Sequence, residues 1–378
     1  MKNRISLFLI LIIMLFTLTG CYDATSIESS YYIVACGIDK GKNAPYNLSI
    51  QIAKNSDNSS DSGSSQSSNY IIYQIECDTF DGGINILNNY LNKIINLSHC
   101  SAFVFSEELA REGIGNLVNS LTSNDEIRPN AYILISNKSA YDVLNKVSNS
   151  GENFSSRFYE YIINSANFTG YSDKTTFEEF ASKINSPIED TVAIYTMVND
   201  ETVQNSGLAI FKDDKLVGTA NALDSIAHLL LTNELKEALI TIPNPFETNS
   251  YIDLEIKNNK RSKIHTNIIN GTPYIVCDLF LHANIKSSGK NFDYTKPENI
   301  EIVTRYAEIF IQNITENDLY KLAKDYDTDV LEFQRNLSLK CLTNEELNNY
   351  HFKEVFKDSY FTVNPNLQIE STYLFSKK

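Results

Sequence analysis

Hydrophobic residues recur along this chain with two periods, which distinguish its predicted strands from its predicted helices. Residues 46–53 place Leu48, Ile50 and Ile52 against polar neighbours, the alternation of a half-buried strand. Residues 31–38 are rich in aromatic and β-branched side chains, which is typical of a buried strand. A turn-forming stretch separates the two segments, so together they predict a β-hairpin. Residues 70–76 predict a further strand.

The following stretch predicts helices that alternate with strands. Ile84, Leu87, Leu91, Ile94 and Ile95 fall on one helical face. Ser106 offers an N-cap oxygen to the helix after it. Short apolar runs predict strands at 101–105 and 131–135. Helical spacing predicts further helices at 107–121 and 140–147. Such alternation indicates at least one right-handed βαβ unit with parallel neighbouring strands.

The remaining chain predicts hairpins and three helices. Two short strands flank Lys212-Asp213-Asp214-Lys215, a compact hairpin turn, and Asn270-Gly271 is a strong signal for a second hairpin. Helices are predicted at 177–184, 222–239 and 298–339. Strands are predicted at 191–198, 207–211, 216–220, 251–257, 263–269, 274–285 and 361–374.

These elements predict an α+β protein of three mixed α/β domains, each a β-sheet with flanking helices. The predicted domains are an N-terminal one at 21–195, a small middle one at 196–250 with a hairpin and a helix, and a C-terminal one at 251–378 with a long helix. The first contains an Asn- and Ser-rich stretch at 55–69, which predicts a mobile loop because it has little apolar area to bury.

The first 20 residues predict a cleaved signal peptide. Lys2 and Arg4 precede a short apolar run that begins at Leu7 and is broken only by Thr17, the arrangement of a secretory signal. The run ends in Leu18-Thr19-Gly20-Cys21, which resembles a bacterial lipobox. That resemblance implies that Cys21 becomes the first mature residue and carries a diacylglycerol and a palmitate. A second acyl chain gives the stable membrane anchoring that one chain does not.

Charge and cysteine content narrow the classes of partner and fold. The net charge of −15 disfavours binding to nucleic acid, because both surfaces would repel each other. Once Cys21 is acylated, five of the six cysteines remain, and an odd number cannot all pair. A disulfide framework is therefore not expected, although a single pair such as Cys36–Cys77 stays open.

No catalytic or metal-binding motif is visible, so we expect neither an enzyme nor a cofactor. The chain has no Gly-x-Ser-x-Gly elbow, phosphate-binding glycine loop or His-Glu-x-x-His sequence. His99 is adjacent to Cys100, and neighbouring side chains on a strand point to opposite faces. We therefore predict a structural, hydrogen-bonded histidine at this position. The other histidines are scattered, which predicts no metal site.

Three stretches of the sequence together carry a family likeness. The first is Gly20-Cys21-Tyr22-Asp23 with the later Gly37-Ile38-Asp39. The second is Ser98-His99-Cys100, followed by Phe105-Ser106-Glu107-Glu108-Leu109-Ala110-Arg111-Glu112-Gly113-Ile114 and then by Glu126-Ile127-Arg128. The third is Gly207-Leu208-Ala209-Ile210-Phe211-Lys212 with Lys215-Leu216-Val217-Gly218. Together these stretches resemble the lipoprotein C subunits of spore nutrient-germinant receptors, the Ger(x)C or GerAC family. The sequence differs from the family pattern in lacking tryptophan and in having Ser98 before His99.

The resemblance implies a non-enzymatic receptor subunit in the inner membrane of the spore, exposed on its outer face. It implies two integral-membrane partners, an A-type and a B-type subunit. Because the second and third stretches carry the likeness, charged residues on them are candidates for a partner interface: Glu107, Glu108, Arg111, Lys212 and Lys215. The alternative function is a lipid-anchored solute-binding protein or envelope hydrolase. A solute-binding protein would have two similar α/β lobes around a ligand cleft.

Overall fold

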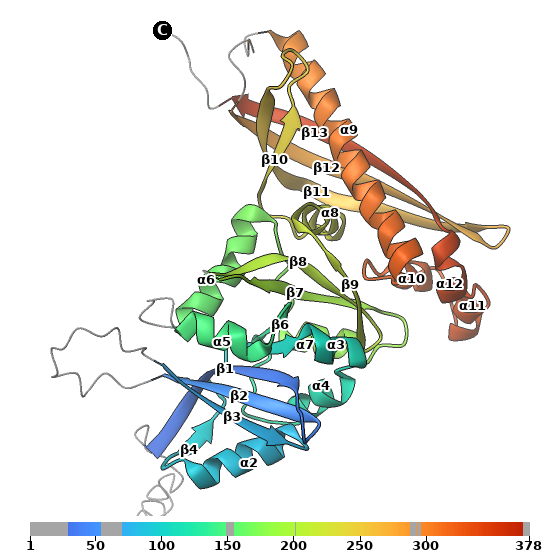
Figure 1. Cartoon of the computed structure of the whole chain (residues 1–378). Coiled ribbons are helices and arrows are strands. Elements are labelled where there is room, and N and C mark those ends of the chain that lie inside the picture. The colour runs from blue at the N-terminus through green and yellow to red at the C-terminus, as the bar shows by residue number, and fades with distance from the viewer. Residues whose placement is uncertain are drawn as a thin grey trace, which may run out of the picture.

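The computed structural model describes residues 29–53, 70–148, 155–200, 202–287, 293 and 296–372. The predicted signal peptide, the lipobox, Cys21 and the loop at 55–69 lie outside the described residues. Two β-sheets with flanking helices are stacked end to end, and helix α8 (Ala222–Thr232) lies between them (Figure 1). The structure therefore confirms the predicted class of mixed α/β sheets with flanking helices.

The first sheet has parallel strands at its centre and antiparallel pairs toward both edges. Its order is β3-β2-β1-β5-β6-β7-β8-β9, and β4 pairs with β1 outside this path. Strands β1, β5, β6 and β7 run parallel, as the predicted βαβ unit requires. The strands are β1 (Ser30–Lys40), β2 (Tyr46–Ala53), β3 (Tyr70–Cys77), β4 (Ile94–Asn96), β5 (Ala102–Ser106), β6 (Tyr132–Ser136), β7 (Thr191–Val198), β8 (Val203–Lys212) and β9 (Lys215–Ala220).

Helices cover both faces of this sheet, which explains the continuous apolar runs of its central strands. One face packs against α2 (Phe80–Tyr90), α3 (Glu107–Glu112), α4 (Gly115–Thr122) and α7 (Phe177–Ile184). The other packs against α5 (Ala140–Ser148) and α6 (Ser155–Thr169). Cys36, Cys77 and Cys100 are buried and free in the core. None of the cysteines that the structure describes forms a disulfide, so the open Cys36–Cys77 pairing is not formed.

Two helix predictions in this unit are wrong in their limits. The predicted helix through Ile95 ends at Tyr90, and Ile94–Asn96 instead pairs in parallel with β1; strand pairing here overrides the helical spacing. The helix predicted at 107–121 is two helices, because Gly113 has φ +119°, a conformation that breaks a right-handed helix. Ser106 occupies the predicted N-cap position, but its side chain makes no capping hydrogen bond.

The second sheet is a four-stranded layer in the order β10-β11-β12-β13. Its strands are β10 (Ala238–Pro243), β11 (Tyr251–Ile269), β12 (Thr272–Ser287) and β13 (Tyr360–Thr372). Asn270 and Gly271 have φ values of 52° and 81° and form the predicted turn between β11 and β12. The two strands predicted at 251–257 and 263–269 are one strand with irregular register. The helix predicted at 222–239 ends at Thr232, and residues 238–243 pair with β11.

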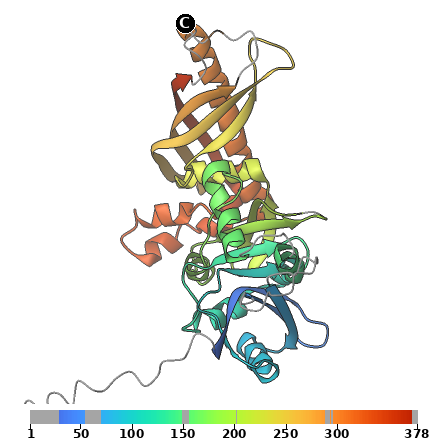
Figure 2. The same ribbon diagram turned by 90° about the vertical axis from the view of Figure 1, so that its left-hand side faces the viewer.

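Helix α9 (Pro297–Lys321) packs along the second sheet. It buries Val303, Ala307, Ile311 and Leu319, whereas Ile302, Tyr306 and Ile309 are exposed. The long helix predicted at 298–339 is interrupted after α9 by a π-helix, η3 (Leu322–Tyr326). Figure 2 shows the short helices that follow projecting beside the junction of the two sheets. They are α10 (Phe333–Ser338), α11 (Asn344–Asn348), α12 (Phe352–Val355) and the 3-10 turn η4 (Phe356–Asp358).

The sheets divide the described chain differently from the predicted domain limits. Residue 195 lies within β7, which pairs antiparallel with β8 along its length. The hairpin of the predicted middle domain therefore continues the first sheet, and its helix α8 packs against both sheets. The first sheet extends past residue 195 because the consecutive strands β7 and β8 pair with each other. Which parts of the chain fold as independent domains stays a prediction.

The outer edge of β13 is closed by side chains from α9. Phe361 N donates to Tyr320 Oη at 3.3 Å, Val363 N to Glu316 Oε1 at 3.0 Å and Leu367 N to Glu308 Oε1 at 3.0 Å. Pro365, at the remaining alternate position, has no N–H. An unpaired edge strand is a template for pairing with another chain, and here each outward donor from 361 to 367 is occupied or missing.

We expect the double substitution Glu308→Ala and Glu316→Ala to cause self-association. It frees two backbone donors on β13, which lowers the free energy of unfolding by about 2 kcal/mol and opens the edge to a second copy. Light scattering over a range of concentrations measures the effect. Glu298→Ala with Glu301→Ala, two exposed α9 carboxylates, is the matched control. A monomeric double variant would contradict the proposed role of these carboxylates.

Candidate functional site

The acidic residues predicted for a partner interface lie on α3 and contact their own chain. The Glu107 carboxylate accepts hydrogen bonds from Arg111 Nη2 at 2.6 Å and from Tyr195 Oη at 2.7 Å. Glu108 is exposed, and its carboxylate lies 3.6 Å from Lys40 Nζ. Their role in a partner interface stays a prediction.

The structure brings the β8–β9 hairpin turn against the junction of α3 and α4. Ile114 N donates to Asp214 O at 3.0 Å, and Gly115 N donates to Asp214 Oδ2 at 3.3 Å. Lys212 Nζ lies 2.6 Å from Asp327 Oδ2, so it joins the hairpin to the C-terminal unit. Lys215 is exposed. The second and third of the stretches that carry the family likeness therefore meet at one place in the fold.

A hollow of about 460 Å³ lies where β1, β5 and β6 end. Crevices at the carboxyl ends of parallel strands commonly bind ligands, and this one is lined by Asp39, Glu107 and Glu108 among others. Asp39, however, accepts hydrogen bonds from Ala140 N and Tyr141 N at the start of α5. Because Glu107 and Glu108 are engaged in ion pairs, the carboxylates of this hollow offer a ligand few free groups.

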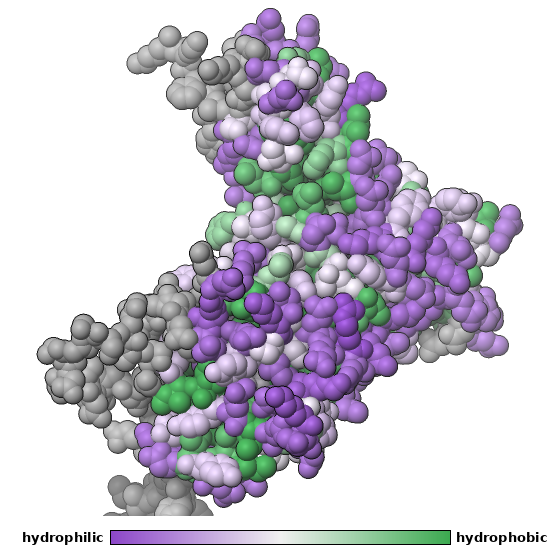
Figure 3. Space-filling view, in the orientation of Figure 1, coloured by the Kyte–Doolittle hydropathy of each residue, from purple (hydrophilic) through white to green (hydrophobic). Residues whose placement is uncertain are grey.

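A second cavity, of about 550 Å³, lies at the junction of the two sheets. We call it the junction cavity. Helix α7, strand β7, helix α8, strand β11 and helix α10 all contribute to its wall. Its charged or ionisable lining residues are Asp173, Lys174, Glu179, Lys183, His228, Glu234, Arg261, Glu332 and Arg335. Hydrophilic residues predominate over the junction on the face that Figure 3 shows.

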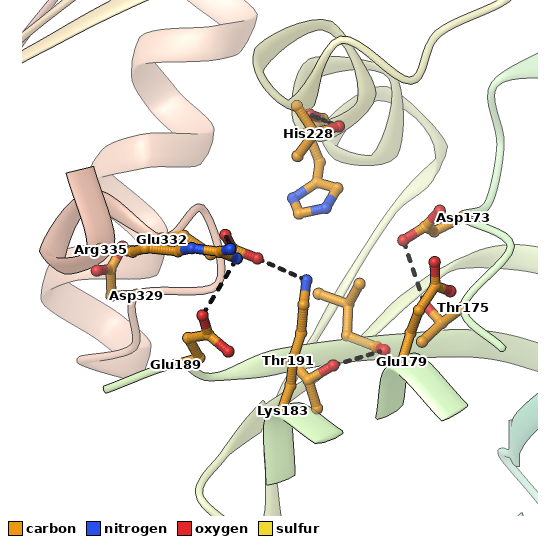
Figure 4. Close-up of polar contacts among 12 residues, drawn as sticks. Asp173, Thr175, Glu179, Lys183, Glu189, Thr191, His228, Asp329, Glu332 and Arg335 are labelled. Atoms are coloured by element: carbon orange, nitrogen blue, oxygen red, sulfur yellow. Dashed lines mark hydrogen bonds and ion pairs between the residues drawn. The ribbon is translucent and has the colours of Figure 1, made fainter. Parts of the chain in front are cut away.

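One side of the junction cavity is an ion-pair network between the two units (Figure 4). Lys183 Nζ on α7 lies 2.8 Å from Glu332 Oε1, just before α10. Arg335 Nη1 lies 3.0 Å from Glu332 Oε2 and 3.3 Å from Glu189 Oε1. The Glu332 carboxylate partner outweighs burial and raises the pKa of Lys183. Each of these charges therefore already has a partner of opposite sign.

The opposite side is acidic, and two of its carboxylates, those of Asp173 and Glu179, accept hydrogen bonds from Thr175 and Thr176. Asp173, Glu179 and Glu234 line the cavity, and none of the three forms an ion pair with a residue that the structure describes. Glu234 is exposed as a residue, although its carboxyl group is partly shielded from solvent. This burial, with the negative charges of Asp173 and Glu179, raises the pKa of Glu234 to about 7. The positive charge of Lys183 opposes this rise, so the two sides of the cavity interact electrostatically.

His228 on α8 points into the space between these two sides (Figure 4). The residue is only 3% exposed, and its ring makes no hydrogen bond to a residue that the structure describes. Burial lowers the pKa of His228 to about 4, so the ring is neutral at pH 7. Buried polar groups normally have a hydrogen-bond partner, and this ring has a donor and an acceptor available.

Sequence reasoning missed the junction cavity and treated His228 as one of several scattered histidines. The lining residues come from segments between 173 and 339, and no short motif links them. The predicted structural role of His99 is supported: its Nδ1 lies 3.1 Å from Ser98 Oγ, and its ring contacts Tyr32 edge-on. In the described part of the chain, no group of three or more His, Cys, Asp or Glu residues could hold a metal ion.

Two family models match the chain in succession. A spore germination protein N-terminal domain matches residues 23–197, and the C-terminal domain of the spore germination B3/GerAC-like proteins matches residues 206–373. The chain belongs to the GerAC family of spore germination proteins. It is therefore similar to the C subunits of germinant receptors, as the resemblance implied.

Named relatives and a solved structure agree with the GerAC assignment. The chain is 24% identical to YfkR of Bacillus subtilis (strain 168), whose name assigns it to spore germination, over 98% of this chain and 97% of the relative. It is 22% identical to the spore germination protein GerQC of Bacillus cereus, over 55% of this chain and 57% of the relative. The crystal structure of the GerBC protein has the same fold, with a TM-score of 0.58 and 16% identity over 89% of this chain and 97% of that chain.

The GerAC-like stretches have visible structural roles in this chain. Asp39 of the Gly-Ile-Asp stretch is 7% exposed and receives the backbone donors of α5, Ala140 N at 2.7 Å and Tyr141 N at 3.1 Å. Gly218 of the hairpin lies under the ring of Tyr326, which leaves no space for a Cβ atom. No helix among the described residues is both long enough and apolar enough to cross a membrane.

Proposed function

We propose that this GerAC-family chain is the lipid-anchored, non-enzymatic C subunit of a spore nutrient-germinant receptor. It assembles with an A-type and a B-type integral-membrane subunit in the spore inner membrane and is exposed on the outer face. The observation that carries this proposal is the pair of family matches, which extends from residue 23 to residue 373 with a short gap. The lipobox at Leu18-Thr19-Gly20-Cys21 supports the anchor.

A lipid at Cys21 gives this function a simple physical basis. Confinement to the membrane surface raises the effective concentration of the subunit near its membrane partners without any new contact. The alternative is a lipid-anchored solute-binding protein, which would need two similar lobes around a cleft. The two sheets described here differ in strand number, order and length, which favours the receptor subunit.

Co-purification tests the assembly. The native chain is tagged at its C terminus, extracted from spore membranes with detergent, and its companions are identified by mass spectrometry. We expect two multi-span proteins of receptor type. Recovery with transporter permeases would instead support the solute-binding protein, and recovery of the chain alone would contradict the assembly.

We expect Cys21→Ala to reduce nutrient-triggered germination at least tenfold, because the variant loses its lipid and with it the local concentration near its partners. Germination by agents that bypass receptors stays normal. Loss of absorbance in spore suspensions measures both, and membrane fractionation follows the protein. Cys341→Ala is the control, because this free cysteine is only partly buried in the folded unit. A normal nutrient response with the variant released from the membrane would contradict the role of the anchor.

A further inference from the structure

Strand β1 starts close in sequence to the proposed lipid anchor. Ser30, the first residue of β1, lies nine positions after Cys21. An extended chain of nine residues spans at most about 32 Å. A lipid at Cys21 therefore holds the start of β1, and the side chains that the fold places beside it, within this distance of the bilayer.

The fold places the end of α2 and the strand β4 beside the start of β1. Ser30 pairs with Ile94, and Tyr31 pairs with Ile95, in a parallel register. Tyr31 Oη donates to Asn92 Oδ1 at 2.8 Å, which ties the loop between α2 and β4 to β1. These elements lie at one end of the molecule, and the second sheet lies at the other (Figure 1).

Two large apolar side chains at this end are open to solvent. Tyr90, the last residue of α2, is 75% exposed, and Ile94, the first residue of β4, is 65% exposed. The Lys93 ammonium group lies 5.5 Å from the centre of the Tyr31 ring. We call Tyr31, Tyr90, Lys93 and Ile94 the anchor-proximal surface. Single exposed apolar residues are common on soluble proteins, but these adjoin the point where the chain would be attached to the membrane.

The segments that form this surface lack the negative charge of the rest of the chain. Residues 82–106 contain one Asp, Glu, Lys or Arg, which is Lys93, and residues 29–38 contain none, whereas the net charge of the chain is −15. Asp81 is in the first turn of α2, at the opposite end from Tyr90. Glu126 accepts a hydrogen bond from Leu97 N at 2.8 Å, past the end of β4. Contact of these segments with lipid therefore buries no carboxylate of their own, which would be costly.

The side chains of this surface suit the boundary between lipid headgroups and acyl chains. Tyrosine is enriched there because its ring is apolar and its hydroxyl group stays hydrated. A lysine ammonium group attracts the phosphates of headgroups, and isoleucine adds apolar area. So few side chains bind a membrane weakly by themselves, because binding strength grows with the apolar area buried. Once a lipid confines the protein to the membrane, they are sufficient to select one orientation.

We propose that the anchor-proximal surface docks on the lipid bilayer and inserts Tyr90 and Ile94 among the headgroups. This inference rests on the proposed lipid at Cys21 and goes beyond it, because an anchor alone leaves the protein free to rotate on its tether. Docking holds the first sheet at the membrane and directs the second sheet away from it (Figure 1). The orientation in which the chain meets its membrane partners is then set by lipid contact.

Tryptophan fluorescence tests the contact, because the chain contains no tryptophan. Ile94→Trp introduces a single tryptophan into the full lipid-modified chain, which is reconstituted into phosphatidylcholine vesicles with or without brominated acyl chains. Bromine quenches tryptophan only at close approach, so we expect brominated lipid to lower the emission of Ile94→Trp by about half or more. Leu342→Trp, at a 94% exposed apolar position in the C-terminal unit, is the matched control and should keep its emission.

A charge substitution tests whether the neighbouring tyrosine takes part. Tyr90→Asp in the Ile94→Trp background places a carboxylate on the docking surface. Because a charge resists transfer into lipid, we expect the quenching to fall about twofold or more. Tyr161→Asp, at a 66% exposed tyrosine of α6, makes the same chemical change away from this surface and leaves the quenching unchanged. Circular dichroism verifies that each variant is folded.

Three results would overturn the proposal: no quenching of Ile94→Trp, equal quenching of Leu342→Trp, or quenching that folded Tyr90→Asp protein retains in full. The vesicles contain no other protein, so a surface that docks on a receptor subunit instead of lipid gives the first result. Flotation of the vesicles measures the anchor separately. If the chain carries no lipid, a histidine tag in place of residues 1–20 attaches it to a nickel-chelating lipid at the same point. The anchor and the docking surface can therefore fail independently.

Discussion

Gly218→Ala is expected to lower the free energy of unfolding by about 3 kcal/mol, a large loss for the removal of one hydrogen. A Cβ atom at this position would lie 2.1 Å from Tyr326 Cε1 and 2.3 Å from Tyr326 Cζ. The ring must therefore move. Its hydroxyl then loses the hydrogen bond that it donates to Thr219 O at 3.0 Å.

The displacement reaches the neighbouring contacts between the two units. Asp327, next in the chain, pairs with Lys212 at 2.6 Å. Thr328 Oγ1 donates to Asp190 Oδ2 at 2.8 Å, and Asp329 N donates to the same oxygen at 2.9 Å. Because these contacts follow Tyr326 in sequence, a shift of the ring strains each of them.

A double-mutant cycle measured by urea unfolding tests this explanation. In a Tyr326→Ala background the ring is absent, so Gly218→Ala is expected to cost less than about 1 kcal/mol. The coupling between the two sites should therefore reach about 2 kcal/mol, as residues in contact can show. Additive losses would mean that the cost of the alanine arises in the β9 backbone and not from the ring.

The elements that the sequence predicted well are those whose neighbours agree with their local pattern. The helix at 177–184 and the strand at 191–198 have the predicted limits. A capping box at Thr176 and Glu179 marks the start of the helix. The Asn270-Gly271 turn was predictable because asparagine and glycine tolerate positive φ. Local chemistry alone decides such features.

Predictions failed where distant pairing decided the structure. The predicted helix extended to residue 239, yet residues 238–243 form a strand that pairs with β11, whose position depends on the whole second sheet. The sequence also did not show that Ile302, Tyr306 and Ile309 are exposed. Periodicity indicates a helix but does not show which of its apolar faces the protein covers. The junction cavity combines residues from five elements, and only the three-dimensional arrangement of both sheets brings them together.

The sequence identified candidate interface residues but did not show which residues they contact. The family likeness identified Lys212 and Glu107, and the structure gives each an intramolecular partner, Asp327 and Arg111. Asp327 lies 115 residues from Lys212 along the chain, and Arg111 lies 4 residues from Glu107. Spacing in sequence could indicate the second pair, whereas no local signal indicates the first.

Stability is expected to fall by as much as about 5 kcal/mol between pH 4 and pH 8 through one buried carboxyl group, that of Asp329. The residue is 5% exposed. Burial is the main cause that raises its pKa to about 8; backbone hydrogen bonds from Gln334 N and Phe333 N oppose the rise, and the carboxylates of Asp190 and Glu332 add to it. In the unfolded chain the same group titrates near 3.9.

The sign follows from proton binding in the two states. Below pH 4 the carboxyl group is protonated in both states, and its contribution to stability is fully present. Between pH 4 and pH 8 the unfolded chain releases the proton while the folded chain keeps it. The free energy of unfolding therefore falls by up to about 1.4 kcal/mol per pH unit as pH rises, and the loss is complete above pH 8.

Asp329→Asn tests this prediction, because the amide cannot ionise and still accepts a hydrogen bond through its oxygen from Gln334 N or Phe333 N. Urea unfolding at intervals from pH 4.5 to pH 9 measures the free energy of unfolding for both proteins. The gap between them should change by several kcal/mol in favour of the variant as pH rises. Asp125→Asn, at an exposed position, is the control and should follow the native protein. Parallel curves for Asp329→Asn and the native protein would mean that Asp329 is already ionised at neutral pH, and that its hydrogen bonds from α10 outweigh its burial.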